Sequence, residues 1–389
     1  MSDDEADPEL LALLRQALLG HAVPVEEAET RVLESAEYVY NNAIDVAIDS
    51  RSTKAAASMI YEQMQKKEYS TKTWSSHDLH PKTKDERTVA FIFVLDLLNF
   101  SFWSDKSEEE RFAIEYQGKR WTGYWSLVAA LQRALDEVVS DGLIFSWLLY
   151  SAGSFEAHTG ADIPITSSDF WQNEDEFTDD VLMHIFRSAT AESMPMLQER
   201  MQCLREAGQT LYEKYECSFI NCIKEANNSA AALVNILARD FTCFRDEFRF
   251  ESRRNARFLK RAQILVADLW ACFEGQGYGE FHDIDKITMF ADYRIPQILS
   301  SMGCLMYNPQ LDHAVRQKKP IGSGHTWEIQ LRGCSIWCVE LIRREIQRAH
   351  PEAKVNAILI DFFLYDTMKE LEQAGNEAIP HHRTRSIWY

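Results

Sequence analysis

The sequence lacks the short motifs that identify the commonest enzyme classes. It contains no Gly-x-Ser-x-Gly and no His-Glu-x-x-His segment, which excludes the usual serine-hydrolase and metalloprotease signatures. It has no nucleotide-binding glycine loop, since the isolated Gly322-Ser323-Gly324 is most simply a turn. Its eight cysteines include no Cys-x-x-Cys pair, and its eleven histidines form no metal-ligand pattern. We therefore expect buried free thiols in a reducing compartment and no metal site.

Positive charge and long apolar runs are also scarce. The 389 residues include 41 basic and 60 acidic side chains, which gives a formal charge of −19. Such a chain repels polyanions, so long-range attraction to nucleic acid or to an anionic membrane is not expected. The longest uncharged apolar run, residues 142–153, is too short to span a bilayer. Because the N-terminus reads MSDDEADPE, without a basic-then-apolar signal, we expect a cytoplasmic protein.

The hydrophobic pattern is mostly that of α-helices. Apolar residues recur three and four positions apart, which predicts helices over residues 7–20, 29–49, 123–138, 194–215, 229–241, 257–275 and 336–349. Two stretches alternate instead: residues 111–124 predict a β-hairpin that turns at Gln117-Gly118, and residues 326–333 predict one short strand. The predicted fold is all-α, with a disordered acidic segment at 1–8 and a single domain over 9–389.

Four aspartates lie within apolar runs and require an explanation. An unpaired buried carboxylate costs roughly several kcal/mol, so such residues usually have a partner or a function. For Asp96 and Asp268 we expect the simpler explanation, in which each caps a helix or holds a buried arginine. Asp292 and Asp361 have aromatic neighbours, which favours an acidic pocket that binds a flat ring. The residues alone leave the function open between a small-molecule hydrolase and a binding protein.

Several long motifs resemble one known family, the queuosine salvage proteins, which are queuosine 5′-phosphate N-glycosylases. The resemblance extends from about Trp74 to Tyr389 and is carried by DLLNFSFW, GYWSLVAALQRALDE, IPITSSDFW, KRAQILVADLW, ITMFADYRIPQ, RGCSIWCVELIR, ILIDFFLYD and the terminal HRTRSIWY. It implies a helical fold similar to the helix-hairpin-helix DNA glycosylases. It also implies cleavage of the N-glycosidic bond of queuosine 5′-monophosphate, which releases queuine for transfer RNA modification.

The resemblance also implies a set of site residues. Asp361 falls at the catalytic position, and the substrate-binding positions fall on His77, Met289, Phe290, Asp292, Ile360, Asp361, Tyr365 and Asp366. Tyr365 is a mild departure, because the family has tryptophan there. Lys260 and Arg294 lie beside matched motifs and are our candidates for the 5′-phosphate. No cofactor is implied. The expected partner is a small-molecule nucleotide, with no direct nucleic-acid binding and no membrane, and we expect a monomer.

The chemistry assigns a separate role to each acid. Queuine is a 7-deazaguanine, so Asp292 could accept two hydrogen bonds from its amide and amine edge while Phe290 stacks on the ring. A 7-deazapurine has no N7 to protonate and leaves poorly. Asp361 would stabilise the positive charge that develops on the ribose, or activate the water. Two alternatives are a glycosylase that acts on nucleic acid and a non-catalytic queuine carrier, which would need no carboxylate at the sugar.

Residues 138–162 are the largest departure from the family pattern. In the family the helix that ends in RALDE continues almost directly into IPIT, whereas here a segment that includes the apolar residues 143–149 intervenes. It is either an insertion or a retained intron. We predict that it leaves the domain as a poorly ordered excursion with an exposed apolar patch, because long surface loops are inexpensive to close.

Overall fold

The computed structural model describes residues 27–137, 163–251, 254–375 and 379–389. The helix predicted over 7–20, the disorder predicted for 1–8 and the excursion predicted for 138–162 lie outside the described residues. The α-helices are α2 (Val32–Asn42), α3 (Ser50–Lys66), α4 (Lys72–Ser76), α5 (Glu86–Leu97), α6 (Tyr124–Asp136), α8 (Ser168–Gln172), α9 (Asp179–Ile185), α10 (Leu197–Tyr215), α11 (Phe219–Glu225), α12 (Ala230–Asp240), α13 (Lys260–Cys272), α14 (Arg294–Ser301), α15 (Pro309–Arg316), α16 (Thr326–Ala349) and α17 (Ala357–Gln373).

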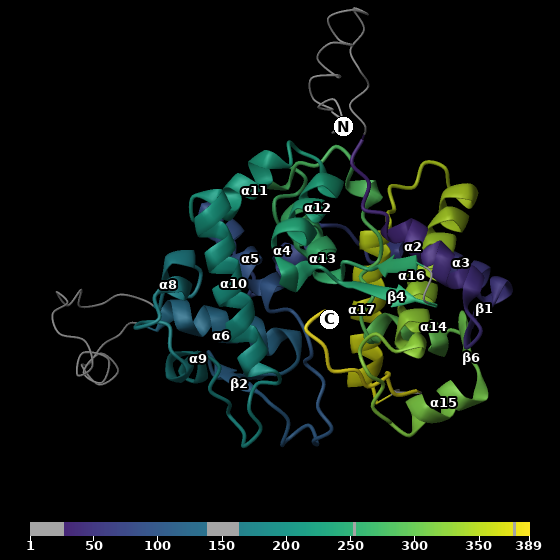
Figure 1. Ribbon diagram of the computed structural model, residues 1–389. Helices are drawn as coiled ribbons and strands as arrows, with labels where there is room; N and C mark the ends of the chain where they lie inside the picture. Colours follow the sequence, from purple (N-terminus) through teal and green to yellow (C-terminus); the bar gives the residue numbers. More distant parts are fainter. Residues whose placement is uncertain (1–26, 138–162, 252–253, 376–378) are drawn as a thin grey trace, which may run out of the picture.

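The helices form two groups. In Figure 1, α6 and α8–α11 gather on the left, α2, α3 and α14–α16 gather on the right, and the C-terminus lies between the groups. Buried apolar side chains from both groups belong to one continuous cluster. The fold is therefore predominantly helical, as predicted. Within the described part of the chain, no helix is both long enough and apolar enough to cross a membrane.

Side-chain caps set the beginnings of several helices. The Asp49 side chain accepts from the backbone N–H of Ser52 at the start of α3. The Asn356 side chain accepts from the N–H of Leu359, 3.0 Å away, and so begins α17. Such caps satisfy backbone donors that the first helical turn leaves without partners. The second cap also places the first apolar residues of α17 against the core.

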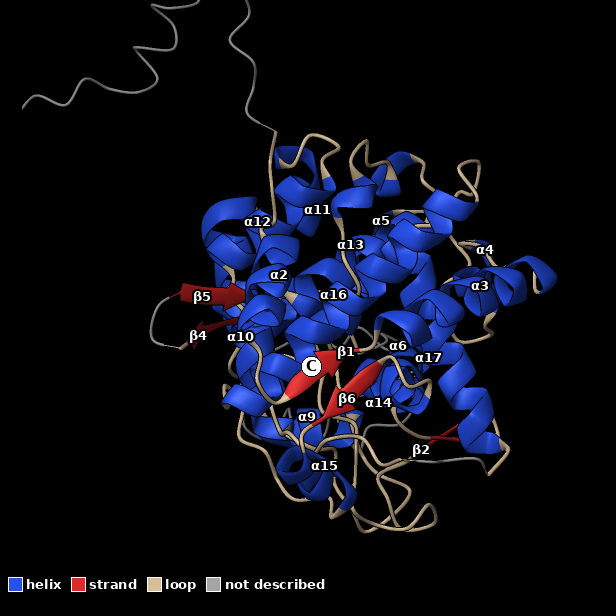
Figure 2. Ribbon diagram, turned by 90° about the vertical axis from the view of Figure 1, so that its right-hand side faces the viewer, coloured by secondary structure: helices blue, strands red, loops and turns tan. Residues whose placement is uncertain are grey.

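The strands form small antiparallel pairs in the described part of the chain. They are β1 (Val46–Ile48) with β6 (Leu305–Tyr307), β2 (Ile114–Tyr116) with β3 (Lys119–Trp121), and β4 (Glu247–Phe250) with β5 (Arg254–Arg257). Figure 2 shows β1–β6 and β4–β5 as separate ribbons beside a mass of helices. The predicted hairpin is confirmed by β2–β3, where Gln117 and Gly118 both have positive φ, as a two-residue type I′ turn requires.

Two predictions about secondary structure are wrong. Residues 326–333 are not a strand, because they form the first turns of α16. Polar and apolar residues alternate there as in a half-buried strand, but the polar residues Glu328, Gln330 and Arg332 are as buried as the apolar residues between them. The helix predicted over 29–49 ends at Asn42, and residues 46–48 pair instead with β6. Pairing with a strand about 260 residues away is not visible in a local pattern.

The C-terminal segment connects distant parts of the chain. The backbone N–H of Ser101 donates to the Tyr389 carbonyl at 3.0 Å, and the Trp103 indole donates to the Thr384 carbonyl at 2.8 Å. Tyr389 is buried with Trp103 and Tyr293 in a second apolar cluster. The segment therefore packs directly beside the stretch that carries Asp292.

Candidate active site

Asp361 lies in the second turn of α17 and is buried, with 6% of its surface exposed. Its Oδ1 accepts a hydrogen bond from the backbone N–H of Phe290 at 3.0 Å. Burial raises the pKa of Asp361 well above its ordinary value, and the nearby charge of Asp292 raises it further. Asp361 therefore retains its proton well above the pH at which an exposed aspartate loses it.

Asp292 has a different environment at the start of α14. Its Oδ1 accepts from the backbone N–H groups of Arg294, at 2.7 Å, and Ile295, at 3.0 Å. It is only partly buried. Two amides at a helix N-terminus stabilise a negative charge. Oδ1 already has these two partners, which leaves Oδ2 to bind a ligand. We had expected both oxygens to be available.

Lys260, the first residue of α13, lies among the acids. It is 5% exposed, and its Nζ donates no hydrogen bond to any described residue. Burial lowers the pKa of Lys260, and this shift is opposed by the charges of Asp292, Asp96 and Asp361. Carboxylates on several sides compete with phosphate for this ammonium group. The surroundings of Lys260 therefore favour a role with the acids over our expected role in phosphate binding.

Asp96 and Asp268 lie close enough to Lys260 for its charge to affect their pKa values, and our expectation for these two acids is wrong. Neither residue caps a helix, and neither forms an ion pair with a described arginine. Asp96 Oδ1 accepts a hydrogen bond from the Asn99 side chain at 3.1 Å, while Asp96 Oδ2 is buried without a partner among the described residues. Burial raises the pKa of Asp96 to about 7. Burial, and then the charge of Asp96, raises the pKa of Asp268. The proximity of Asp96 to Lys260 and Asp268 was not predictable, because Asp96 lies on α5 and the other two residues lie on α13.

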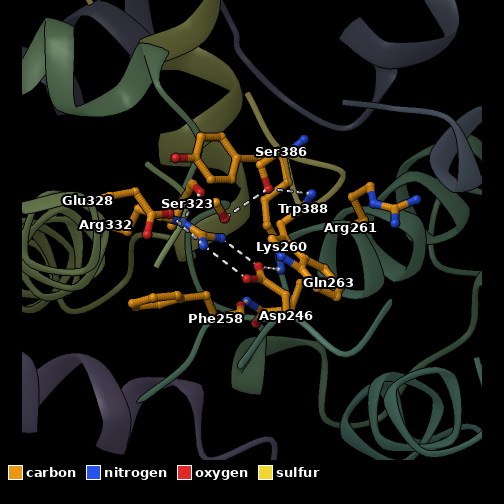
Figure 3. A network of polar contacts seen from close by, with 12 residues as sticks. Asp246, Phe258, Lys260, Arg261, Gln263, Ser323, Glu328, Arg332, Ser386 and Trp388 are labelled. Atoms are coloured by element: carbon orange, nitrogen blue, oxygen red, sulfur yellow. Dashed lines mark hydrogen bonds and ion pairs between the residues drawn. The ribbon is translucent and has the colours of Figure 1, made fainter. Parts of the chain in front are cut away.

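A buried ion network fixes the segments that carry Lys260 and Asp292 (Figure 3). The Arg332 guanidinium donates to both oxygens of Asp246, at 2.9 and 2.5 Å, and to Glu328 at 3.2 Å. Asp246 also accepts from the backbone N–H of Lys260 at 3.1 Å. Arg332 Nε donates to the carbonyl of Ala291 at 2.8 Å. Arg332 therefore helps to position both the segment that carries Lys260 and the segment that carries Asp292. The sequence around Arg332 did not predict this role.

Aromatic rings surround the acids. The Phe290 and Phe362 rings are 6.0 Å apart and tilted, and Phe290 is almost fully buried. Tyr365 is partly buried, one turn beyond Asp361. Asp366 accepts from the Tyr69 hydroxyl at 2.6 Å, so one of its oxygens has a protein partner. The Phe290 and Phe362 rings therefore give an apolar surface near Asp361, and the aromatic-walled pocket for a flat ring stays a prediction.

The remaining predicted site residues are His77, Met289 and Ile360. His77 stacks on Trp125 at 3.4 Å, and beside it the His80 ring shares a 2.9 Å hydrogen bond with the Tyr124 hydroxyl. Burial, and then the charge of Asp268, raises the pKa of Tyr124, so Tyr124 lies near the buried acids. Met289 and Ile360 are fully buried in the core.

Two cavities among the described residues lie away from Asp292 and Asp361. One has a volume of about 720 Å³ and is bordered by Arg31, Lys286 and Trp337. The other has a volume of about 350 Å³ and is bordered by Lys82 and Gln132. Within the described ranges, no cluster of His, Cys, Asp and Glu is arranged to hold a metal ion.

Comparison with known proteins gives consistent matches. A family model described as queuosine salvage protein matches residues 79–143 and 147–389. A Schizosaccharomyces pombe protein named queuosine 5′-phosphate N-glycosylase/hydrolase is 42% identical over 374 residues, covering 92% of this chain and all of the relative. Proteins of the same name from Mus musculus and Sphaerobacter thermophilus are 38% and 35% identical, covering 92% and 86% of this chain and 98% and 91% of their own lengths.

Proposed function

The chain belongs to the queuosine salvage protein family, and we propose that it hydrolyses the N-glycosidic bond of queuosine 5′-monophosphate to release queuine. The relatives that share its length carry the name of this activity. The observation that carries the proposal for this chain is the meeting of Asp361, Asp292 and Lys260 beside the Phe290 ring. A hydrolase needs carboxyl groups at the bond to be broken, whereas a carrier does not.

The two acids divide the work in this mechanism. Burial raises the pKa of Asp361 and so favours its protonated form, whereas two backbone N–H groups donate to Asp292, and this difference suits the first to the role of an acid and the second to that of a charge-stabilising group. As the glycosidic bond breaks, its electron pair moves onto the glycosidic nitrogen of the base, and this nitrogen takes the proton from Asp361. The Asp292 carboxylate stabilises the positive charge on the ribose. This modifies our expectation, which gave Asp292 the base edge and Asp361 the ribose.

Water completes the reaction. It attacks the anomeric carbon, and its proton passes to the Asp361 carboxylate, which restores the starting state. Lys260 stabilises Asp361 during the interval in which that group is ionised, because the ammonium lies close to it in a site shielded from water. Phe290 supplies a flat apolar surface for the base. No step requires a metal or an organic cofactor.

Two other functions would require different features of the protein. A glycosylase acting on nucleic acid would need a broad basic surface, and the net charge of −19 opposes one. A carrier would bind queuine and release nothing. We propose that the protein acts as a cytosolic monomer on the free nucleotide.

The experiment offers the purified protein three substrates in parallel: queuosine 5′-monophosphate, queuosine and queuosine-containing transfer RNA. Mass spectrometry then measures the queuine released from each. We expect release from the monophosphate and none from the RNA. Release from the RNA alone would favour the polymer glycosylase, and tight binding without release would favour the carrier.

A further inference from the structure

Helix α17 extends from the proposed active site into a cluster of cations. Asp361, Tyr365 and Lys369 follow one another at four-residue spacing, which places them along one side of the helix. A rise of about 1.5 Å per residue separates the backbones of Asp361 and Lys369 by about 12 Å. The order along this side is therefore an acid, a ring and a cation. A nucleotide presents its glycosidic bond, its sugar and its 5′-phosphate in the same order.

Lys369 and Arg294 share one carboxylate. Lys369 Nζ donates to Glu372 at 2.8 Å, and Arg294 donates to the other Glu372 oxygen at 3.1 Å. The Arg294 side chain is 12% exposed and the Glu372 side chain 28% exposed, so the ion pair lies near the surface but is partly shielded. Arg294 also lies near the acids. Burial acts to lower the pKa of Arg294, but nearby groups, which include Tyr365 and Asp292, outweigh burial and raise that pKa.

Arg111 adds a third cation. Its Nε is buried without a hydrogen-bond partner, and its guanidinium donates no hydrogen bond to any described residue. It lies near Lys369: burial lowers the pKa of that lysine, Arg294 lowers it next, and Arg111 contributes as well. Lys369 and Arg294 therefore share the Glu372 carboxylate, and Arg111 lies near Lys369 without donating a hydrogen bond to that carboxylate.

We propose that Arg111, Lys369 and Arg294 bind the 5′-phosphate of the nucleotide, and that Glu372 occupies their donors until the phosphate arrives. A phosphate monoester carries a charge of about −1.5 to −2 near neutral pH, so it attracts the three cations more strongly than the single charge of a carboxylate does. Guanidinium groups hold phosphate with paired hydrogen bonds, and the partly exposed Glu372 side chain has room to turn away. The inference rests on the proposed function, because it takes the ligand to be a nucleotide.

The test measures binding in an Asp361→Asn background, so that the ligand is not consumed. Calorimetry gives the ratio of the affinities for queuosine 5′-monophosphate and for queuosine. Lys369→Ala or Arg111→Ala should reduce this ratio at least tenfold, while the affinity for queuosine stays within about threefold. Lys369→Arg should restore most of the ratio, and Glu372→Gln should increase it. Each variant is checked for folding by thermal unfolding, and Lys369→Gln replaces any alanine variant that fails.

The matched control is Lys67→Ala. Lys67 also pairs with an acid on α17, since its Nζ lies 2.6 Å from Glu370, but it belongs to a different ion pair. Its replacement should leave the ratio unchanged. An unchanged ratio in both Lys369→Ala and Arg111→Ala overturns the phosphate site, even if the wild-type protein releases queuine. If the Asp361→Asn protein binds neither ligand and the wild type releases no queuine, the proposed function fails as well.

Discussion

The carboxyl group of Asp361 accepts a hydrogen bond from the backbone N–H of Phe290, 3.0 Å away and 71 residues earlier in the chain. This bond fixes the acid relative to the ring that would receive the base. It also leaves the side chain of Phe290 free to serve as an apolar surface, because only its backbone is used. If this pair and its neighbours form a catalytic site, specific substitutions should change activity, stability and pH dependence in distinct ways.

The first prediction concerns the acid itself. Asp361→Asn should reduce kcat at least 100-fold, the scale of a lost general acid, while substrate affinity stays close to that of the wild type. Since burial raises the pKa of Asp361, wild-type activity should fall as the pH rises through that raised pKa, because the acid then loses the proton that it donates. Steady-state kinetics across pH measure both effects.

Two results would count against this role for Asp361. One is turnover by Asp361→Asn within about tenfold of the wild type. The other is activity that only increases with pH, because such a profile indicates a group that works as a carboxylate.

The second prediction separates the charge of Asp292 from its place at the start of α14. Asp292→Asn keeps a side-chain oxygen for the two backbone amides, so the free energy of unfolding should change little. It removes the negative charge, so kcat should fall at least tenfold. Asp292→Ala should show the same loss of activity and a further loss of about 1 kcal/mol of stability. If Asp292→Asn keeps full activity, Asp292 is a helix cap and nothing more.

The third prediction concerns the network that positions the site. Arg332→Met should lower the free energy of unfolding by about 3–5 kcal/mol, because it leaves Asp246 and Glu328 buried without their partner. Arg348→Ala is the control, because it removes an arginine from an ion pair on the same helix whose arginine side chain is 71% exposed. The control should change stability by less than about 1 kcal/mol. Urea denaturation measures both variants, and equal losses would contradict the assignment.

The fourth prediction is a pH effect on stability. The pKa of Asp96 is about 7 in the folded protein and about 3.9 in an unfolded chain. Between these values the folded state holds more protons, so the contribution of Asp96 to stability declines as the pH rises from about 4 to 7. Asp96→Asn should remove this decline, and the gain over the wild type should be greatest above pH 7. A constant difference between the two proteins across this range would contradict the buried, unpaired acid.

Sequence patterns predicted the parts of the fold that depend on local periodicity. The amphipathic segments 123–138 and 194–215 contain α6 and α10, and Gln117-Gly118 forms the predicted turn. The pattern failed where long-range burial decides the outcome, as in 326–333, where residues 328–332 of α16 are all buried and polar and apolar residues alternate by coincidence.

The sequence likewise predicted only those residues of the candidate site that a local pattern reveals. Asp292 and Asp361 stand out in sequence because each is an acid in an apolar run, and the structure brings them close enough for the charge of one to raise the pKa of the other. Arg332 and Lys369 gave no comparable signal, because cations are usually exposed, and Lys260 was singled out only by the matched motif beside it. Their importance depends on which helices meet, and no local pattern contains that information.

The most direct test of the account is the product ratio from queuosine 5′-monophosphate. Purified protein is incubated with an excess of this nucleotide, and queuine and ribose 5-phosphate are quantified by mass spectrometry over time. The account predicts that the two products appear in equal amounts over many turnovers, with little of either from Asp361→Asn. Queuosine 5′-monophosphate that stays intact, or one molecule bound per protein with no ribose 5-phosphate formed, would contradict it.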